Sequence, residues 1–510
     1  MHQIWTVAAK RARGSLRLGA LTLAGSVACV LVLSASAAPP PAFAYRTLAP
    51  GFFSTCAITV AGAARCWGHK LGATESSGGA SRVPVTVPGL GSGVTHLTTG
   101  SQFACAVVRG AARCWGGGPR GELGNGTKIP SSVRPVAVTG LQNGVKGIDA
   151  GSSHACAITS ASGVKCWGFG ILGDGSGVSH LPPGVATPVD VVGVTGVKAI
   201  SVGPTRACAL TAGGGVKCWG GSVLGDGSRP HGGGLLAVDV SGLTSGVKQV
   251  SAGFDHACAL TASGGVKCWG HNHLGQVGTF GPSVVYALVP VDVPGLTSGV
   301  TAISAGYYHQ CALMTGGAVK CWGDNNYGQV VGNGRRTPPS APVTVAGLGT
   351  GVRAIAAGHS YSCAIDRAGI TKCWGSNSGQ QAGWAPTIAF GAPRAIHGQG
   401  PQRAATSGRF LTPTRNISCS LSDRPGRIRV HCQSLSRPHS VTMDGAGRLR
   451  ICRGVRCLGN PAQGTATLRY GARTSVGRFQ CRSQFSGVRC TVTRSGKGFL
   501  IDKTGVRPVG

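Results

Sequence analysis

The chain has 510 residues, of which 87 are Gly and 42% are hydrophobic. Only two Glu residues, Glu75 and Glu122, and three Met occur, whereas helices are normally built from Ala, Leu, Glu, Lys, Gln and Met. The composition therefore excludes a mostly helical protein. Abundant Val, Thr, Gly and Ser favour short strands joined by tight turns, and we predict an all-β fold with a buried core.

Lys and Arg total 48 against 14 Asp and Glu, which gives a formal net charge of +34. The excess is greatest after residue 400, where 20 basic residues face three acidic ones. Such a segment attracts anionic polymers and anionic lipids in a salt-dependent way. The charge does not distinguish among these partners, and nothing in the sequence predicts a specific nucleic acid.

Residues 1–44 have the arrangement of a signal peptide. Basic residues from Lys10 to Arg17 precede an apolar run from Leu18 to about Ala38 and the motif Ala42-Phe43-Ala44, which is the order found in secretory leaders. We expect cleavage after Ala44 and a secreted or cell-envelope-associated protein. An uncleaved membrane anchor is the alternative, since about 20 apolar residues can span a bilayer. We predict no transmembrane segment in the mature chain.

A unit of about 50 residues recurs seven times between residues 45 and 397. Each copy contains a pair of cysteines, and the second is always followed by Trp-Gly. A full copy has four short runs of strand length, each bounded by Gly or Pro. A repeated four-stranded unit of this length is typical of a β-propeller blade, so we predict a seven-bladed propeller.

The cysteine spacing fits one disulfide within each blade. The hairpin around Ala212–Gly214 has a three-residue turn and the hairpin around Arg109-Gly110 a two-residue turn. In both registers the cysteines stand opposite each other, with Cα atoms about 4.5 Å apart, which is within disulfide range. Zinc is the alternative, but the spacing does not match the usual fingers, and we predict no metal site. The expected pairs are Cys56–Cys66, Cys105–Cys114, Cys156–Cys166, Cys208–Cys218, Cys258–Cys268, Cys311–Cys321 and Cys363–Cys373.

The ring also has a predicted point of closure. Six copies have a strand of the pattern Val-x-x-apolar-x-small-Gly before the cysteine hairpin, whereas the seventh-blade sequence, from Cys363 to about Ile396, ends without one. The segment Tyr45–Gly51 fits this pattern. We therefore expect this N-terminal strand to close the ring by pairing with the last segment, which would remove an open sheet edge.

The segment from Gly253 to Gln276 reads Gly-x-x-His-x-Cys-Ala-Leu, then Val-Lys-Cys-Trp-Gly, then Gly-Gln. This pattern, which recurs over residues 45 to about 397, resembles the regulator-of-chromosome-condensation repeat, and the resemblance implies a seven-bladed propeller. Members of that family include a nucleotide-exchange factor for a nuclear GTPase and, among secreted bacterial proteins, a β-lactamase inhibitor. The leader and the paired cysteines favour the bacterial secreted type and argue against nucleotide exchange.

A linker at 398–407 leads into an Arg-rich β domain predicted at 408–510. A domain of this size needs covalent support for its small core, and its six cysteines allow 15 connectivities. We expect sequential pairing: Cys419–Cys432, Cys452–Cys457 and Cys481–Cys490. Phe410–Cys419, Gly487–Cys490 and Gly496–Phe499 resemble an uncharacterised domain of bacterial secreted proteins, which implies no activity. With Cys29 set aside in the leader, 20 cysteines remain, and this even number suits an oxidising compartment.

The sequence offers few groups for catalysis. Two sets recur at fixed repeat positions: Asp190, Asp239 and Asp292, and His154, His256 and His309. We expect the Asp set on the solvated side of an outer strand. We expect the His set to pack or hydrogen-bond, because other copies have Ser, Phe, Arg or Tyr there, and we expect the repeated Trp to pack between blades. No nucleophile elbow, phosphate loop or zinc-protease helix occurs, so we predict no enzyme and no cofactor.

Strand order predicts which loops share a face of the propeller. In a four-stranded meander, the turn before the cysteine hairpin and the loop after Trp-Gly open on the same face, and these segments carry large variable side chains, which suit an interaction surface. The opposite face carries repetitive Gly, Ser and Thr turns. The predicted binding-face residues are Phe52, Phe53, Phe254, His271, His273, Tyr307, Tyr308, Tyr327 and His359.

Together these features predict a secreted, non-enzymatic binding protein. The propeller face would bind a protein or a cell-wall polymer, and the C-terminal domain would adhere to anionic polymer or lipid. Two alternatives stay open: an inhibitor of an extracellular enzyme, by analogy with the family, and a polysaccharide lyase or hydrolase that uses a propeller pocket.

Overall fold

A computed structural model gives the fold of the protein. It describes residues 44–69, 80–176, 180–228, 234–279, 285–336, 341–384, 387–396, 407–412, 416–424, 427–434, 438–454, 468, 473–476, 478–484, 487–502 and 504–509. Every regular element in these residues is a β-strand, which confirms the all-β prediction. No helix in the described ranges could span a membrane. Residues 1–43 of the predicted signal peptide lie outside the described residues.

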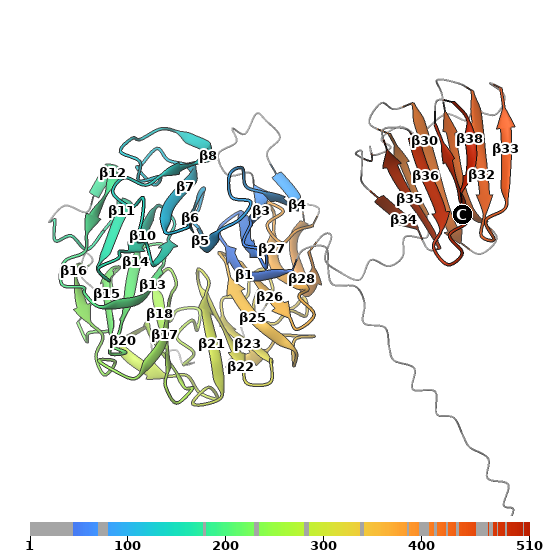
Figure 1. Ribbon diagram of the computed structural model, residues 1–510. Coiled ribbons are helices and arrows are strands. Elements are labelled where there is room, and N and C mark those ends of the chain that lie inside the picture. The colour runs from blue at the N-terminus through green and yellow to red at the C-terminus, as the bar shows by residue number, and fades with distance from the viewer. Residues whose placement is uncertain are drawn as a thin grey trace, which may run out of the picture. The chain divides into compact units, whose positions relative to one another are not determined.

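Seven four-stranded antiparallel sheets are described between residues 45 and 395, each a meander of consecutive strands (Figure 1). The first has β1 (Tyr45–Pro50), β2 (Ser54–Thr59), β3 (Ala64–His69) and β4 (Ala80–Thr86). The second has β5 (Val94–Thr99), β6 (Phe103–Val108), β7 (Ala111–Gly117) and β8 (Ser131–Ala137). The third has β9 (Gly147–Ala150), β10 (His154–Ile158), β11 (Val164–Gly170) and β12 (His180–Asp190).

The remaining four sheets repeat the same order. The fourth has β13 (Val197–Val202), β14 (Arg206–Thr211), β15 (Val216–Gly220) and β16 (Gly234–Asp239). The fifth has β17 (Val247–Ala252), β18 (His256–Thr261), β19 (Val266–His271) and β20 (Tyr286–Asp292). The sixth has β21 (Val300–Ala305), β22 (His309–Met314), β23 (Val319–Gly323) and β24 (Val343–Thr344). The seventh has β25 (Val352–Ala357), β26 (Tyr361–Asp366), β27 (Thr371–Asn377) and β28 (Thr387–Ala395).

The cysteine pairs join the second and third strands of each sheet. Cys56 stands opposite Cys66 and Cys208 opposite Cys218 in the strand register, and the same holds for the other five sheets. All seven predicted pairs form disulfides in the structure, with Cα atoms 4.0 or 4.1 Å apart. Because the register keeps the cysteines opposite whether the turn has two or three residues, the disulfide position survives the change of loop length.

The Trp after each second cysteine packs between its own sheet and the preceding one. Trp167, on the third sheet, lies in one core cluster with Phe103 and Leu123 of the second-sheet segment, and its indole N–H donates to the carbonyl oxygen of Glu122 at 2.9 Å. Six of these Trp side chains are at most 1% exposed and the seventh, Trp115, is 2% exposed. The predicted packing of Trp between sheets is confirmed.

The N-terminal strand was expected to pair with the last segment, and this expectation is wrong. β1 pairs instead with β2, with Ala49 opposite Cys56 and Pro50 opposite Thr55, and the seventh sheet already has four strands of its own. The reason is local, because only Gly51, Phe52 and Phe53 separate β1 from β2, so the two strands form a hairpin. β1 is therefore the first strand of the first sheet.

Side-chain contacts nevertheless connect the first and seventh sheets. Trp67 lies in one core cluster with Tyr361 and Ile396. The Tyr361 hydroxyl lies 2.7 Å from Thr55 Oγ1 and donates to the carbonyl oxygen of Ser54 at 3.0 Å. Trp67 thus makes the same kind of contact with the seventh sheet that Trp167 makes with the second.

The turns between first and second strands approach one another so closely that a glycine is required in each. A Cβ on Gly151 would lie 2.0 Å from the carbonyl oxygen of Gly203, and one on Gly203 would lie 2.2 Å from that of Gly253. The last turn approaches the first in the same way, since a Cβ on Gly358 would lie 2.9 Å from the Gly51 oxygen. The seven glycines are Gly51, Gly100, Gly151, Gly203, Gly253, Gly306 and Gly358.

We predict that Gly203→Ala lowers the free energy of unfolding of the propeller by about 2 kcal/mol or more, because the added methyl group must displace a neighbouring backbone. The matched control is Gly213→Ala in the β14–β15 turn, where a Cβ meets no atom within 4 Å. Urea unfolding followed by Trp fluorescence measures both, since residues 401–510 contain no Trp. Equal stability of the two variants would contradict the glycine argument.

Residues 407–509 form two five-stranded antiparallel sheets, here called the C-terminal domain. The first has β29 (Ser407–Leu411), β30 (Ile417–Arg424), β31 (Arg427–Ser434), β32 (His439–Asp444) and β33 (Leu449–Arg453). The second has β34 (Arg473–Val476), β35 (Phe479–Gln484), β36 (Gly487–Val492), β37 (Gly498–Ile501) and β38 (Val506–Val509). Buried residues of both sheets, including Val430 and Phe479, form one core, so the sheets pack face to face.

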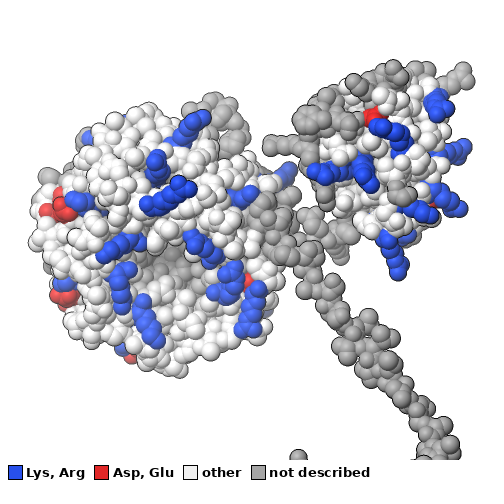
Figure 2. Space-filling view, viewed as in Figure 1, with Lys and Arg blue, Asp and Glu red and all other residues white. Residues whose placement is uncertain are grey.

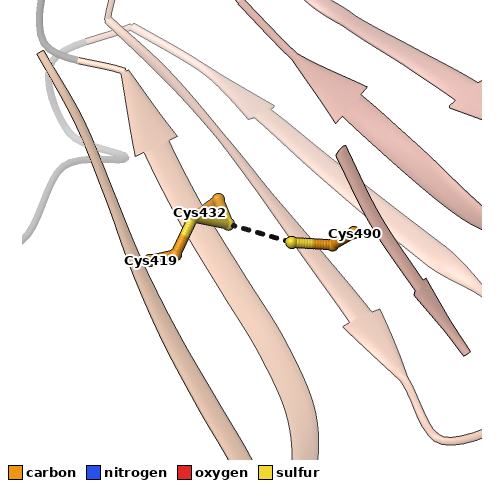
Figure 3. A group of neighbouring side chains, drawn as sticks. All are labelled: Cys419, Cys432 and Cys490. Carbon is orange, nitrogen blue, oxygen red and sulfur yellow. Dashed lines mark hydrogen bonds between the residues drawn. A yellow bond between two sulfur atoms is a disulfide. The ribbon is translucent and has the colours of Figure 1, made fainter. Parts of the chain in front are cut away.

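Two disulfides lie in the middle of this core. The predicted pairs Cys419–Cys432 and Cys481–Cys490 are confirmed, one in each sheet. Cys432 Sγ lies 3.9 Å from Cys490 Sγ across the sheet interface (Figure 3). Cys452 is also disulfide-bonded, while its predicted partner Cys457 lies outside the described residues.

Candidate binding face

One end of the seven sheets carries the turns between first and second strands. In each of these turns a glycine N–H donates to the carbonyl oxygen three residues later, as from Gly253 to His256 at 2.8 Å. The seven turns surround a pocket of about 80 Å³. Phe52, Tyr307 and His359 lie on its wall, so part of the predicted binding face surrounds this pocket.

Aromatic side chains form a continuous set on this face, which we call the aromatic arc. Phe52 is central, because its ring centroid lies 3.7 Å from that of His359 and 5.5 Å from that of Tyr307. Tyr307 stacks on Phe254 at 4.4 Å. The arc consists of His69, Phe53, Phe52, His359, Tyr307, Phe254, Tyr308, His273, His271 and Tyr286.

The structure therefore brings together eight of the nine predicted face residues. Tyr327, the ninth, is 38% exposed and has no ring contact with the arc among the described side chains. The two remaining members of the arc are His69, at the end of β3, and Tyr286, which was not predicted because it lies at the start of an outer strand rather than in a turn. The arc covers the first, fifth, sixth and seventh sheets, whereas the corresponding turns of the other three contain Gln102, Ser152, Ser153, Pro204 and Thr205.

Most of the arc consists of Phe and Tyr rings, which are uncharged at neutral pH. Burial also lowers the pKa of His359 to about 4 and raises that of Tyr307 to about 12. Asp255 lies next to the arc, and burial raises the pKa of its carboxyl group while nearby His271 and Arg206 lower it. The arc thus presents mainly neutral aromatic surface.

A second set of polar residues lies one layer below this face. His154, His256 and His309 begin the second strands of their sheets and are at most 2% exposed, which fits the packing role predicted for them. Burial lowers the pKa of His154 to about 4 and those of the other two to about 3. Arg206 occupies the same position in the fourth sheet, is 1% exposed, and donates to the carbonyl oxygen of Val223 at 2.8 Å.

The burial of these three histidines predicts that the free energy of unfolding falls in acid. Each is neutral in the folded protein down to about pH 3 or 4, whereas its unfolded pKa is about 6.5, so the unfolded state binds more protons below pH 6.5. The contribution of each histidine to the free energy of unfolding is therefore complete above pH 6.5. This contribution decreases by about 1.4 kcal/mol per pH unit as the pH falls towards the pKa of the folded state.

His154→Phe places at this position the residue that Phe103 provides in the second sheet. Between pH 6 and 4, we expect the free energy of unfolding to depend on pH less steeply in the variant than in the wild type, by about 1.4 kcal/mol per pH unit. The reason is that Phe has no proton to bind. Urea unfolding monitored by Trp fluorescence at several pH values measures the slope. An unchanged slope would show that His154 does not bind a proton on unfolding.

The repeated Asp residues are solvated, as predicted, and each is also ion-paired. Asp190 and Asp239 stand opposite Lys165 and Lys217 in the strand register, with N–O distances of 2.8 and 2.9 Å. Asp292 pairs with Lys267 at 2.9 Å. The Asp side chains are 61–77% exposed, so each pair contributes no more than about 1 kcal/mol.

Two sequence profiles of the regulator of chromosome condensation (RCC1) repeat match the chain. One matches residues 110–158, 263–313 and 317–365, and the other matches residues 247–276 and 300–329. The matched segments contain the cysteine hairpins of the fifth and sixth sheets and one hairpin cysteine each of the second, third and seventh sheets. The chain therefore contains RCC1 repeats within residues 110–158 and 247–365.

Two known relatives illustrate how the repeat occurs in other chains. The human E3 ubiquitin-protein ligase HERC2 is 31% identical over 345 residues, which are 62% of this chain and 7% of HERC2. The mitochondrial RCC1 domain-containing protein RUG3 of Arabidopsis thaliana is 30% identical over 306 residues, which are 56% of this chain and 66% of RUG3. The matched region is thus a small part of HERC2.

These names correct the prediction that the protein is not an enzyme. HERC2 and several shorter matches in the HERC group are named as E3 ligases, so the same repeats occur in proteins named as enzymes. The prediction was wrong because it rested on the absence of three catalytic motifs and on the scarcity of candidate groups such as paired carboxylates. That scarcity bears on acid–base catalysis by paired carboxylates and not on enzymes in general.

Solved structures with the same fold are RCC1-like propellers. Prp20p from Saccharomyces cerevisiae has a TM-score of 0.56 at 19% identity, covering 72% of this chain and 90% of Prp20p. Human WBSCR16 has a TM-score of 0.55 at 19% identity, covering 67% of this chain and 96% of its own. Similarity at this level of identity concerns the fold alone. The chain therefore carries RCC1 repeats on an RCC1-like propeller fold.

Proposed function

We propose that the propeller binds a protein through the aromatic arc. The observation that carries this proposal is the continuous contact of ten aromatic and imidazole rings on one face, with Phe53 40% exposed and Tyr286 42% exposed. Aromatic residues are enriched at protein interfaces and dominate their binding energy. A mature globular chain that exposes such a set in one place has a surface suited to a partner.

The relatives add support for a protein as the partner. The structural study of Prp20p concerns its binding to Gsp1p and histones, and Prp20p also forms a complex with Kap60. The face proposed here differs in chemistry from a polyanion-binding surface, because its rings are mainly neutral at pH 7. A cell-wall polymer bound by stacking of sugar rings would be the other outcome of the experiment below.

The double variant Tyr307→Ala/Tyr308→Ala tests the arc. Both side chains are half-buried, and their loss removes ring contacts with Phe254 and His273. We expect the affinity for the partner to fall at least tenfold, since central interface aromatics contribute about 2 kcal/mol or more.

The measurement is quantitative capture on the immobilised mature protein, from culture medium and from envelope extract. Gly213→Ala, at the opposite ends of the strands, is the matched control and is expected to keep full capture. Trp fluorescence confirms that both variants are folded. Loss of capture in the Gly213 variant, with retention in the tyrosine variant, would place the binding surface on the other face.

We also propose that the seven sheets are the seven blades of one closed ring. The supporting contacts are those of Gly358 with the Gly51 carbonyl and of Trp67 with Tyr361. For localisation, we propose secretion or retention in the cell envelope, as in bacterial secreted proteins. The leader-like residues 1–44 and the disulfides support this proposal, because such disulfides persist in oxidising compartments.

For the C-terminal domain we propose adhesion to an anionic surface. Figure 2 shows many Lys and Arg and few Asp and Glu on the visible face of the domain. Arg482 and Arg489 stand directly opposite each other on β35 and β36 and are both exposed. Like charges in this position destabilise a sheet, so a bound anion would relieve a cost that the free protein carries.

The variant Arg482→Gln/Arg489→Gln tests this second surface. We expect weaker binding to phosphatidylglycerol vesicles. We also expect the slope of the logarithm of the binding constant against the logarithm of the salt concentration to become shallower, by about one per removed contact. Vesicle co-sedimentation at several salt concentrations measures both quantities. The control, Lys198→Gln/Lys248→Gln on the propeller, removes the same charge, and an equal effect of the two variants would contradict a specific role of this domain.

A further inference from the structure

The second sheet lacks an ion pair that the third, fourth and fifth sheets form between their last two strands. Every copy has Lys or Arg before the second cysteine, and in three sheets this residue faces an Asp across the strand pair. In the second sheet the residue is Arg113, and it faces Ala137. Among the described residues, the Arg113 guanidinium has no hydrogen bond or ion pair.

The cysteine hairpin of the same sheet has a shorter turn than those of the other six sheets. Its turn is reduced to Arg109 and Gly110, both with positive φ, 51° and 81°. This is the geometry of a two-residue hairpin turn that prefers Asn, Asp or Gly at its first position. Arginine there carries a backbone cost, and the hydrogen bonds of the hairpin offer no compensation specific to an arginine side chain.

The Arg109 side chain lies against the neighbouring first-sheet segment. A Cβ on Gly93 would lie 3.1 Å from both Cγ and Nε of Arg109, and the Arg109 backbone N–H donates to the Gly93 carbonyl oxygen at 3.1 Å. The side chain is therefore positioned along the turn between β4 and β5 even though its guanidinium, among the described residues, has no acceptor.

A groove of about 720 Å³ lies between these two segments, at the opposite ends of the strands from the aromatic arc. Three arginines line it, Arg109, Arg113 and Arg134, together with Pro88, Pro135 and residues 89–92. None of the described residues that line it is acidic. Its volume lies within the range of small-molecule sites.

We propose that this groove binds a small ligand that carries two or more closely spaced oxyanion groups. A planar guanidinium binds phosphate or carboxylate through two parallel hydrogen bonds. Three guanidinium groups without an acidic partner among the described residues match an anion of multiple charge. The apolar side chains would contact the carbon skeleton between the anionic groups. Phosphate esters and polycarboxylates share this chemistry.

The test is isothermal titration calorimetry of the mature chain with two probes, tripolyphosphate and citrate, at constant ionic strength. Binding of either probe to the wild type is expected, and the stronger one identifies the anionic group. Two variants change the groove: Ala137→Asp supplies for Arg113 the carboxylate partner that three other sheets have, and Arg109→Gly supplies a residue suited to the turn. We expect each to weaken binding at least tenfold while the Trp-monitored stability is kept.

Two controls separate the groove from general charge. Lys198→Ser removes one positive charge from an exposed site outside the groove, and Asp239→Ala frees Lys217 in a sheet without the groove arginines. Neither is expected to change the affinity by more than twofold. The proposal is overturned if neither probe binds the wild type, if Lys198→Ser weakens binding as much as Arg109→Gly, or if both groove variants bind like the wild type.

Discussion

The close approach of the glycine turns at the centre of the sheets is the constraint on which the rest of the propeller depends. A carbonyl oxygen of one turn occupies the space where the preceding turn would carry a Cβ, so the distance between neighbouring sheets is set by backbone contact. The residues that follow each glycine are thereby brought within ring-contact distance. Phe52 and His359 lie side by side for this reason, although they come from opposite ends of the propeller sequence.

The disulfides stabilise strand pairing within each sheet, and the tryptophans stabilise packing between neighbouring sheets. Each disulfide closes a loop of about ten residues, which contributes roughly 2–3 kcal/mol through the unfolded state, and it holds the two central strands of one sheet together. Each Trp packs against the preceding sheet and connects neighbours. Because the two residues are adjacent in the chain, their side chains point to opposite faces of the strand, so one short motif provides both contacts.

Much of the fold could be predicted because it is periodic. The cysteine registers, the sheet-to-sheet Trp contacts and the face shared by Phe254, Tyr307 and Tyr308 all follow from strand alternation and turn length. The partner of β1 was predicted wrongly because the strand pattern is the same for a strand that completes the last sheet and for one that begins the first. The short separation of β1 from β2 in the sequence was the signal that favoured a hairpin.

The features that sequence reasoning missed depend on contacts between copies rather than on the repeat itself. Tyr286 joins the aromatic arc only through the position of its sheet neighbour His271. The burial of Arg206 follows from a position that other copies fill with His. The arginine groove depends on Ala137, which stands where the third, fourth and fifth sheets have Asp. This difference is present in the sequence, but only the strand register shows that Ala137 faces Arg113.

The closed ring depends most directly on the contact between the last and first turns, and hydrogen exchange of one amide tests this contact. The His359 N–H donates to the Gly51 oxygen at 3.2 Å, and the Ser101 N–H donates to the Ser152 oxygen at the same distance between sheets adjacent in the chain. A closed ring predicts similar protection of the two amides. Exchange of His359 at the rate of an unprotected amide, with Ser101 still protected, would contradict it.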